Sequence, residues 1–271
     1  MQIIFLPLLY LSLNTAMAGP VSGFFDGHIH YSRDVWEALP PQRALELLGE
    51  AGIARALVSG TPGEGAERLY RAAPDRVVPF LRPYQSRAGR YTWFRDATVP
   101  DYLREQLARI PYRGIGEFHL DGEHARSPVV ADVIALARSR GLALHAHTDG
   151  GGIRALLDQA PDIPVIWAHG GFDEPESLLR DLLDTHAQLY IELSFREGLT
   201  LDGQLTAVWE ALFTDFPSRF LVGMDTYSPG RWMELQELTA MTRGWLAQLP
   251  AEVAQAIAWD NAARLFPVVG Q

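Results

Sequence analysis

Histidines gather at the ends of apolar segments in this chain, which contains no cysteine. Without cysteine, thiol nucleophiles, disulfides and cysteine-ligated metals are excluded, so any metal must rest on imidazole nitrogens and carboxylate oxygens. Such ligands hold zinc, which lowers the pKa of bound water to about 7. Six of the eight histidines end or follow a predicted strand, namely His28, His30, His119, His145, His147 and His169. Metal-assisted activation of water is the chemistry that these residues predict.

His28 and His30 form a His-x-His pair in the first of these segments. Side chains two residues apart on a strand point the same way, so both rings can reach one ion. Alone, this spacing is more often structural than metal-binding. Its weight comes from the other segments, because five apolar runs end in residues of ligand type: His28 with His30, Glu117, His145, His169 and Asp225.

Glu117 lies inside an apolar run, where an unpaired charge is costly. An arginine could compensate this carboxylate, and Arg113 and Arg82 are the candidates. A metal ion is the other possibility. The residues alone leave both explanations open.

The segments that position these residues alternate between short strands and amphipathic helices. Strands are predicted at 24–28, 54–58, 77–81, 114–118, 142–145, 165–169, 189–193 and 220–224. Helices are predicted between them at 43–49, 66–73, 102–110, 129–140, 153–159, 176–186, 205–213 and 232–249. Eight such units in about 250 residues predict an α/β fold, a single TIM-type (β/α)8 barrel with its catalytic face at the strand C-termini. A doubly wound sheet is the alternative, but no glycine-rich phosphate turn follows the first strand.

The arrangement resembles the amidohydrolase superfamily, whose barrels carry His-x-His on strand one, Lys or Glu on strand four, His on strands five and six, and Asp on strand eight. The resemblance covers the chain from residue 19 to 271. It implies one ligand set for two ions: His28, His30 and Asp225 for the more buried ion, His145 and His169 for the more exposed one, and Glu117 as the bridge. Many amidohydrolases add a β-sandwich made from both chain ends, and here the sequence has no room for it.

Shorter segments resemble two branches of this superfamily. Residues 116–121 are similar to the Gly-Glu-x-Gly-Leu-Asp segment of TatD-like metal-dependent hydrolases, except that His119 replaces the second glycine. Residues 168–171, 223–225 and 261–266 are similar to the amidohydrolase-related branch, which also holds decarboxylases. His145 and His147 are also spaced as His-x-His. The family pattern favours His145 as the ligand, which leaves His147 to contact the substrate or support a ligand.

The resemblance implies a metal-dependent hydrolase that cleaves an amide, ester, lactone or phosphoester bond of a small molecule with water. Zinc is the expected metal, as one or two ions. Asp225 would take a proton from the attacking water and return it to the leaving group. The candidates for substrate contacts are His147, Arg82, Arg196 and His119, for each of which packing or ion pairing is the alternative.

Three other functions compete with this prediction. A metal-dependent non-oxidative decarboxylase is the first, although such relatives usually lack the bridging carboxylate that Glu117 would supply. A barrel that binds a metal or solute without turnover is the second. A TatD-like nuclease is the third, but 23 Lys and Arg against 33 Asp and Glu give a net charge of −10, so nucleic acid is not an expected partner.

Residues 1–18 have the form of a signal peptide. Residues 3–13 are almost entirely apolar, and Ala16-Met17-Ala18 before Gly19 fits a signal-peptidase site, although no Lys or Arg precedes the apolar run. The run is about half of the ~20 residues that a membrane-spanning helix needs. The sequence therefore predicts a barrel domain at 19–271 that is periplasmic or secreted and leaves the membrane after cleavage.

Overall fold

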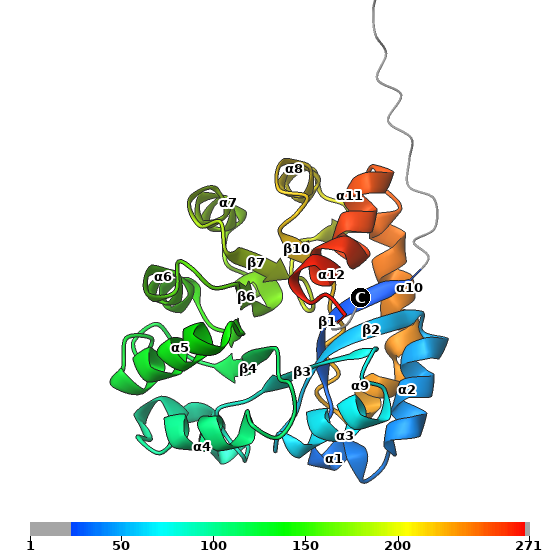
Figure 1. The fold of residues 1–271 in the computed structure, drawn as a ribbon. Helices are drawn as coiled ribbons and strands as arrows, with labels where there is room; N and C mark the ends of the chain where they lie inside the picture. Colours follow the sequence, from blue (N-terminus) through cyan, green and yellow to red (C-terminus); the bar gives the residue numbers. More distant parts are fainter. Residues whose placement is uncertain (1–22, 269–271) are drawn as a thin grey trace, which may run out of the picture.

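The computed structural model describes residues 23–268. Eight parallel strands hydrogen-bond in the order in which they occur in the sequence and curl into a nearly closed barrel (Figure 1). They are β1 (Phe24–His30), β2 (Ile53–Ser59), β3 (Val77–Leu81), β4 (Gly114–His119), β5 (Ala143–His147), β6 (Val165–Trp167), β7 (Leu189–Glu192) and β10 (Phe220–Leu221). The last strand meets the first through backbone bonds, since the Gly27 N–H donates to the Val222 carbonyl at 2.7 Å. This confirms the predicted TIM-type barrel, and no sandwich domain stands beside it within residues 23–268.

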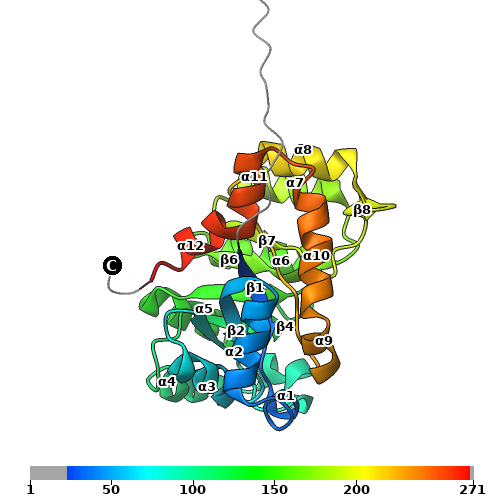
Figure 2. The same ribbon diagram turned by 90° about the vertical axis from the view of Figure 1, so that its right-hand side faces the viewer.

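Helices surround the strands on the outside of the barrel (Figure 1). The longer ones are α2 (Pro41–Glu50), α3 (Glu64–Ala72), α4 (Val99–Gln106), α5 (Pro128–Arg140), α6 (Gly150–Gln159), α7 (Glu176–Thr185), α8 (Ala207–Asp215) and α10 (Leu235–Leu246). Short ones are α1 (Arg33–Trp36), α9 (Pro229–Met233), α11 (Ala251–Gln255) and α12 (Asn261–Leu265). Figure 2 shows α9 and α10 running along the outside of the barrel next to α2.

Local sequence explains where several helices begin and end. Helix α5 begins after Ser127, whose hydroxyl accepts from the Val130 N–H, and it ends at Gly141, whose φ of 63° suits glycine. Asp149 caps α6 in the same way by accepting from the Gly152 N–H at 2.7 Å. These caps fix the loops that follow β4 and β5.

Two apolar clusters hold the barrel together. The larger one lies between the strands and the surrounding helices. The smaller one fills the barrel interior below the site, where Phe25, Phe80 and Ile166 pack with Ala262 and Phe266 at the C-terminal end of the chain. The side chains at the C-terminal ends of the strands are therefore supported from below by a packed core.

The structure adds detail that the sequence did not predict. The helix expected at 232–249 is divided at Glu234 into α9 and α10. A small hairpin of β8 (Thr200–Leu201) and β9 (Gln204–Leu205) precedes α8, and 3-10 turns η1 (Ala88–Tyr91), η2 (Trp93–Arg95) and η3 (Ala168–Gly171) and a π turn η4 (Ala256–Asp260) complete the chain. The predicted signal peptide at 1–18 lies outside the described residues. Within 23–268, none of the helices is long and apolar enough to cross a membrane.

Candidate metal centre

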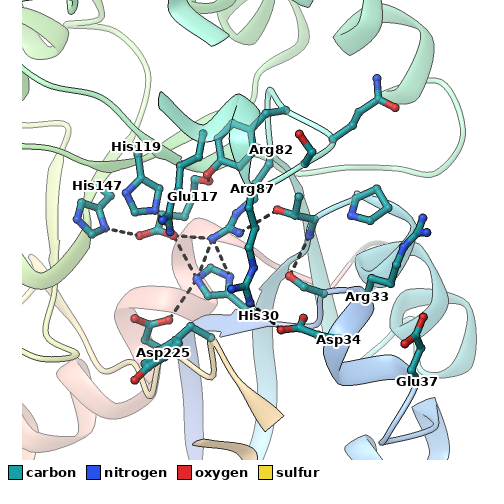
Figure 3. Close-up of a pocket in the computed structure, with 18 residues that line it drawn as sticks. His30, Arg33, Asp34, Glu37, Arg82, Arg87, Glu117, His119, His147 and Asp225 are labelled. Carbon is teal, nitrogen blue, oxygen red and sulfur yellow. Dashed lines mark hydrogen bonds and ion pairs between the residues drawn. The ribbon is translucent and has the colours of Figure 1, made fainter. Parts of the chain in front are cut away.

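Three side-chain donors converge at the C-terminal end of the barrel. Nε2 of His28 lies 3.1 Å from Nε2 of His30. Oδ1 of Asp225 lies 3.2 Å from Nε2 of His30 and 3.7 Å from Nε2 of His28. Both histidines come from β1, and Asp225 follows β10 with its N–H donating to the His28 carbonyl at 2.7 Å. Figure 3 shows His30 and Asp225 facing one another at the base of a cavity.

These separations fit one metal ion. Tetrahedral zinc with bonds of about 2.0–2.1 Å keeps its ligand atoms about 3.3 Å apart. Two imidazole nitrogens that face each other at 3.1 Å, as in His28 and His30, also need a cation or a proton between them. The donor set of His28, His30 and Asp225 is therefore spaced for a divalent ion.

The Nδ1 atoms of the histidine rings are engaged by other groups of the protein. Nδ1 of His28 lies 2.7 Å from Oε2 of Glu192, and Nδ1 of His30 lies 2.9 Å from the Ser59 hydroxyl. Nδ1 of His169 donates to the Ser194 carbonyl at 2.9 Å. Its Nε2 is buried without a hydrogen-bond partner in the described chain. With Nδ1 engaged in this way, Nε2 of His28 and of His169 would carry the lone pair of the neutral ring, and that nitrogen faces inward as metal ligation requires.

The electrostatics of the centre favour a cation. Glu117, Glu192 and Asp225 surround His28, and despite burial their charges raise the pKa of that imidazole well above its usual value. Burial alone would raise the pKa of Glu192, but His28 and His169 lower it to about 2. The pKa of Asp225 is also lowered, by His28 and His30. Ionised carboxylates buried together are stable only when positive charge compensates them.

Glu117 joins several of the predicted site residues. Arg82 donates to its Oε2 at 2.7 Å, and Nδ1 of His147 lies 2.9 Å from its Oε1. Nε2 of His119 lies 3.8 Å from Oε2, and Nε2 of His169 lies 3.6 Å from Oε1. Of the two arginines predicted as possible partners of Glu117, Arg82 is therefore the one that pairs with it. Arg113 donates instead to the Pro267 carbonyl.

His145 and His147 occupy different depths of the barrel. The register of β4 and β5 places His147 opposite His119 at the mouth and His145 opposite Gly116 one layer below. His145 is fully buried beside the ring of His28, at 4.6 Å between centroids, and burial lowers its pKa well below the usual value. In the described chain the structure brings His147, and not His145, within hydrogen-bond distance of Glu117.

Arg196 lies apart from this cluster. Its guanidinium donates to the backbone carbonyls of Gly170, Phe172 and Glu174 and stacks over the Trp209 ring at 5.0 Å. Arg196 therefore stabilises the loop that follows β6. Unlike Arg82, it does not line the cavity of the centre.

Glu192 is the residue of the centre that sequence reasoning missed. This fully buried carboxylate at the end of β7 accepts from the Ser194 N–H and hydroxyl as well as contacting His28. A methyl group on Gly223 would lie 2.0 Å from its Oε1, so glycine there makes room for the carboxylate. The signal was available, because Glu192 interrupts an apolar strand just as Glu117 does.

The centre opens into a cavity of about 880 Å³, large enough for a small molecule. Its base is formed by His30, Arg82, Glu117 and Asp225, and its outer wall carries three further arginines: Arg33, Arg87 and Arg90. His119 and His147 separate it from a second cavity of about 420 Å³, which is lined by both aromatic and acidic side chains: Tyr91, Phe94, Phe172, Asp121, Asp149, Asp173 and Glu174. These two histidines thus face any ligand held in either space.

Sequence comparison assigns the family of the chain. The family described as Amidohydrolase matches residues 25–268, nearly the whole of the described chain. The chain belongs to this amidohydrolase family. The match confirms the predicted superfamily and the prediction of an enzyme. No curated protein matches the sequence of this amidohydrolase.

Solved structures share the fold of this amidohydrolase. An amidohydrolase from Burkholderia multivorans with bound zinc is 16% identical over 91% of this chain and 99% of its own, with a TM-score of 0.59. A Pseudomonas putida protein assigned as a 2-pyrone-4,6-dicarboxylic acid hydrolase is 15% identical over 92% and 99%, with a TM-score of 0.62. A 2,6-dihydroxybenzoate decarboxylase, solved with 2,6-dihydroxybenzoate, is 13% identical over 90% and 99%, with a TM-score of 0.58. At these identities the likeness establishes the fold.

Proposed function

We propose that this amidohydrolase is an exported, zinc-dependent hydrolase that uses water to cleave an amide, ester, lactone or phosphoester bond of a small molecule. The observation that carries the proposal is the convergence of Nε2 of His28, Nε2 of His30 and Oδ1 of Asp225 at the base of an open cavity. The zinc bound by the Burkholderia multivorans amidohydrolase supports this choice of metal. Residues 1–18 are the basis for proposing export to the periplasm or medium.

His28, His30 and Asp225 would hold the ion, with His169 as the nearest further imidazole. The ion would supply Lewis-acid chemistry and lower the pKa of bound water. Asp225 lines the cavity and is ionised, so it can accept the proton of the attacking water and return it to the leaving group. His147 and His119, which lie higher in the cavity wall, are placed to contact the substrate on either side of the reacting bond.

Decarboxylation is the second candidate function. Arg33, Arg87 and Arg90 on the outer wall of the cavity can bind a carboxylate, which is the group that a decarboxylase acts on. The structural likeness to 2,6-dihydroxybenzoate decarboxylase supports this alternative. A hydrolase of a carboxylate-bearing lactone or ester would use the same arginines, so the reaction must be measured.

The test is a substrate panel assayed with zinc-loaded protein. The panel contains amides, lactones, phosphoesters, single-stranded DNA and ring carboxylates, and both hydrolysis products and CO₂ are measured. We expect hydrolysis of at least one small substrate without CO₂, loss of activity on chelation and recovery when zinc is returned. Release of CO₂ from a ring carboxylate without hydrolysis would instead identify a decarboxylase, and cleavage of DNA alone would identify a nuclease.

A further inference from the structure

Arg82 directly follows β3, and its guanidinium lies inside the centre, next to Glu117 and His30. Its Nη2 donates to Oε2 of Glu117 at 2.7 Å, and its Nη1 donates to the Thr61 hydroxyl at 3.0 Å. The guanidinium also lies over the ring of Tyr84, at 5.6 Å, and the residue is only 8% exposed. Figure 3 shows Arg82 between Glu117 and His30. Contacts on several sides fix the guanidinium in this position.

Arg82 leaves the proposed ligand atom of His30 accessible. Its Nη2 lies 3.2 Å from Nδ1 and 3.0 Å from Nε2 of that ring. An atom nearly equidistant from both ring nitrogens at this range lies over the face of the imidazole, because a position in the ring plane would collide with the carbon between them. The lone pair of Nε2 lies in the ring plane. It can therefore still point toward His28 and Asp225.

The donors that a second ion would use are already engaged. Two groups of ligand-type atoms contain His28, and a third, formed by Glu117, His119 and His147, lies at the mouth of the centre. Both oxygens of Glu117 have protein partners there, since Arg82 donates to Oε2 at 2.7 Å and Nδ1 of His147 lies 2.9 Å from Oε1. Oε2 also lies 3.1 Å from Nε2 of His30, so Glu117 is turned toward the first site as well. A second ion bound to Glu117 would have to displace the guanidinium and lie close to its positive charge.

The charges of the centre balance with one divalent ion. Glu117, Glu192 and Asp225 contribute three negative charges, and Arg82 contributes one positive charge. Asp26, a further buried carboxyl nearby, is not counted among them, because it accepts from the backbone N–H groups of His28 and Met224 instead of contacting these side chains. Two net negative charges remain, which one divalent ion neutralises and two ions would exceed. Buried sites far from neutrality are costly.

We infer that Arg82 takes the place of a second metal ion, so that the centre binds a single divalent ion and the guanidinium supplies the other positive charge on Glu117. This inference rests on the metal site of the proposed function. It changes the role of Glu117 from a bridge between two ions to the partner of Arg82. Arg82 is thereby a positioning residue that fixes the number of ions.

The test counts zinc per chain after equilibrium dialysis, by mass spectrometry, in folded protein. We expect one zinc in the wild type and in Arg82→Lys, which keeps the charge. We expect two in Arg82→Met, because the freed Glu117 can then bind an ion with His147 and His119. Arg87→Met is the matched control, since Arg87 lines the same cavity but is exposed and paired with Asp34 at 2.7 Å, and it should keep one zinc.

The outcomes separate the inference from the proposed function. No zinc in the wild type overturns both. Two zinc ions in the wild type, or one in folded Arg82→Met, overturn the inference and leave the proposed function standing. Should Arg82→Met fail to fold, Glu117→Gln decides. If Glu117→Gln binds one zinc with an affinity within tenfold of the wild type, the role of Arg82 is supported. If this variant binds less than one zinc, or loses more than tenfold in affinity, Glu117 is a ligand of the ion and the inference is overturned.

Discussion

Asp225→Asn is expected to lower kcat/KM by roughly 10²–10⁴, the range typical of a lost general acid and base. The carboxylate of Asp225 faces the cavity and lies 3.2 Å from Nε2 of His30 and 3.7 Å from Nε2 of His28, and unlike Glu117 it is not paired with Arg82. Asparagine keeps the shape of the side chain but cannot accept the proton. It also tolerates the left-handed backbone of this position, where φ is 45°, so the loop should survive the change. Steady-state kinetics on the best panel substrate measure the effect.

Thermal unfolding and zinc content must be measured beside these kinetics. We expect a melting temperature close to that of the wild type and weaker zinc binding, because a neutral amide replaces a charged ligand. Asp34→Asn is the control, since Asp34 is an exposed acid of the same cavity that pairs with Arg87. Its effect should stay within tenfold. A fully metal-loaded Asp225→Asn enzyme with more than a tenth of wild-type activity would rule out Asp225 as the proton carrier.

Glu192→Gln is expected to weaken zinc binding by about 10–100-fold, the usual cost of losing a carboxylate behind a ligating histidine. Glu192 accepts a hydrogen bond from the Nδ1–H group of His28 at 2.7 Å, and this tautomer would leave Nε2 free to bind the ion. A glutamine amide can instead present its NH₂ group to Nδ1. The proton then moves to Nε2, and that nitrogen can no longer bind metal. Competition with a chromophoric chelator measures the affinity.

The control for Glu192→Gln is Glu37→Gln, which changes an exposed carboxylate of the same cavity. We expect zinc affinity in that variant to be unchanged. A fall in melting temperature that is equal with and without zinc would identify Glu192 as a packing residue. A fall in melting temperature that appears only with zinc would instead show that Glu192 orients the ligand His28.

Much of the fold follows from hydrophobic periodicity, because each buried strand is a short apolar run and each helix carries an apolar face. The division of 232–249 at Glu234 does not, since the whole segment has helical composition, and in the structure both α9 and α10 contact α2. The donors that end strands, such as His30 and Glu117, could also be predicted. In a parallel barrel the C-terminal ends of all strands meet on one face.

Some pairwise choices within the site required three-dimensional register. The choice between Arg82 and Arg113 did not, because Arg82 follows β3 at the C-terminal face that holds Glu117, whereas Arg113 precedes β4 at the opposite end of the barrel. His145 and His147 share a strand and a face, and their difference in depth comes from pairing with β4. Glu192 was predictable by the rule used for Glu117. The left-handed φ of His169, 59°, was not, because even histidine, which adopts this region more readily than most residues, does so only in a minority of cases.

One ion is expected among His28, His30 and Asp225, and the most direct test is an anomalous difference map from a zinc-loaded crystal at the zinc absorption edge. We predict one strong peak within bonding distance of Nε2 of His28, Nε2 of His30 and Oδ1 of Asp225. A crystal with zinc in solution but no peak at these three atoms, or with its only peak at Glu117, His119 and His147, would contradict it.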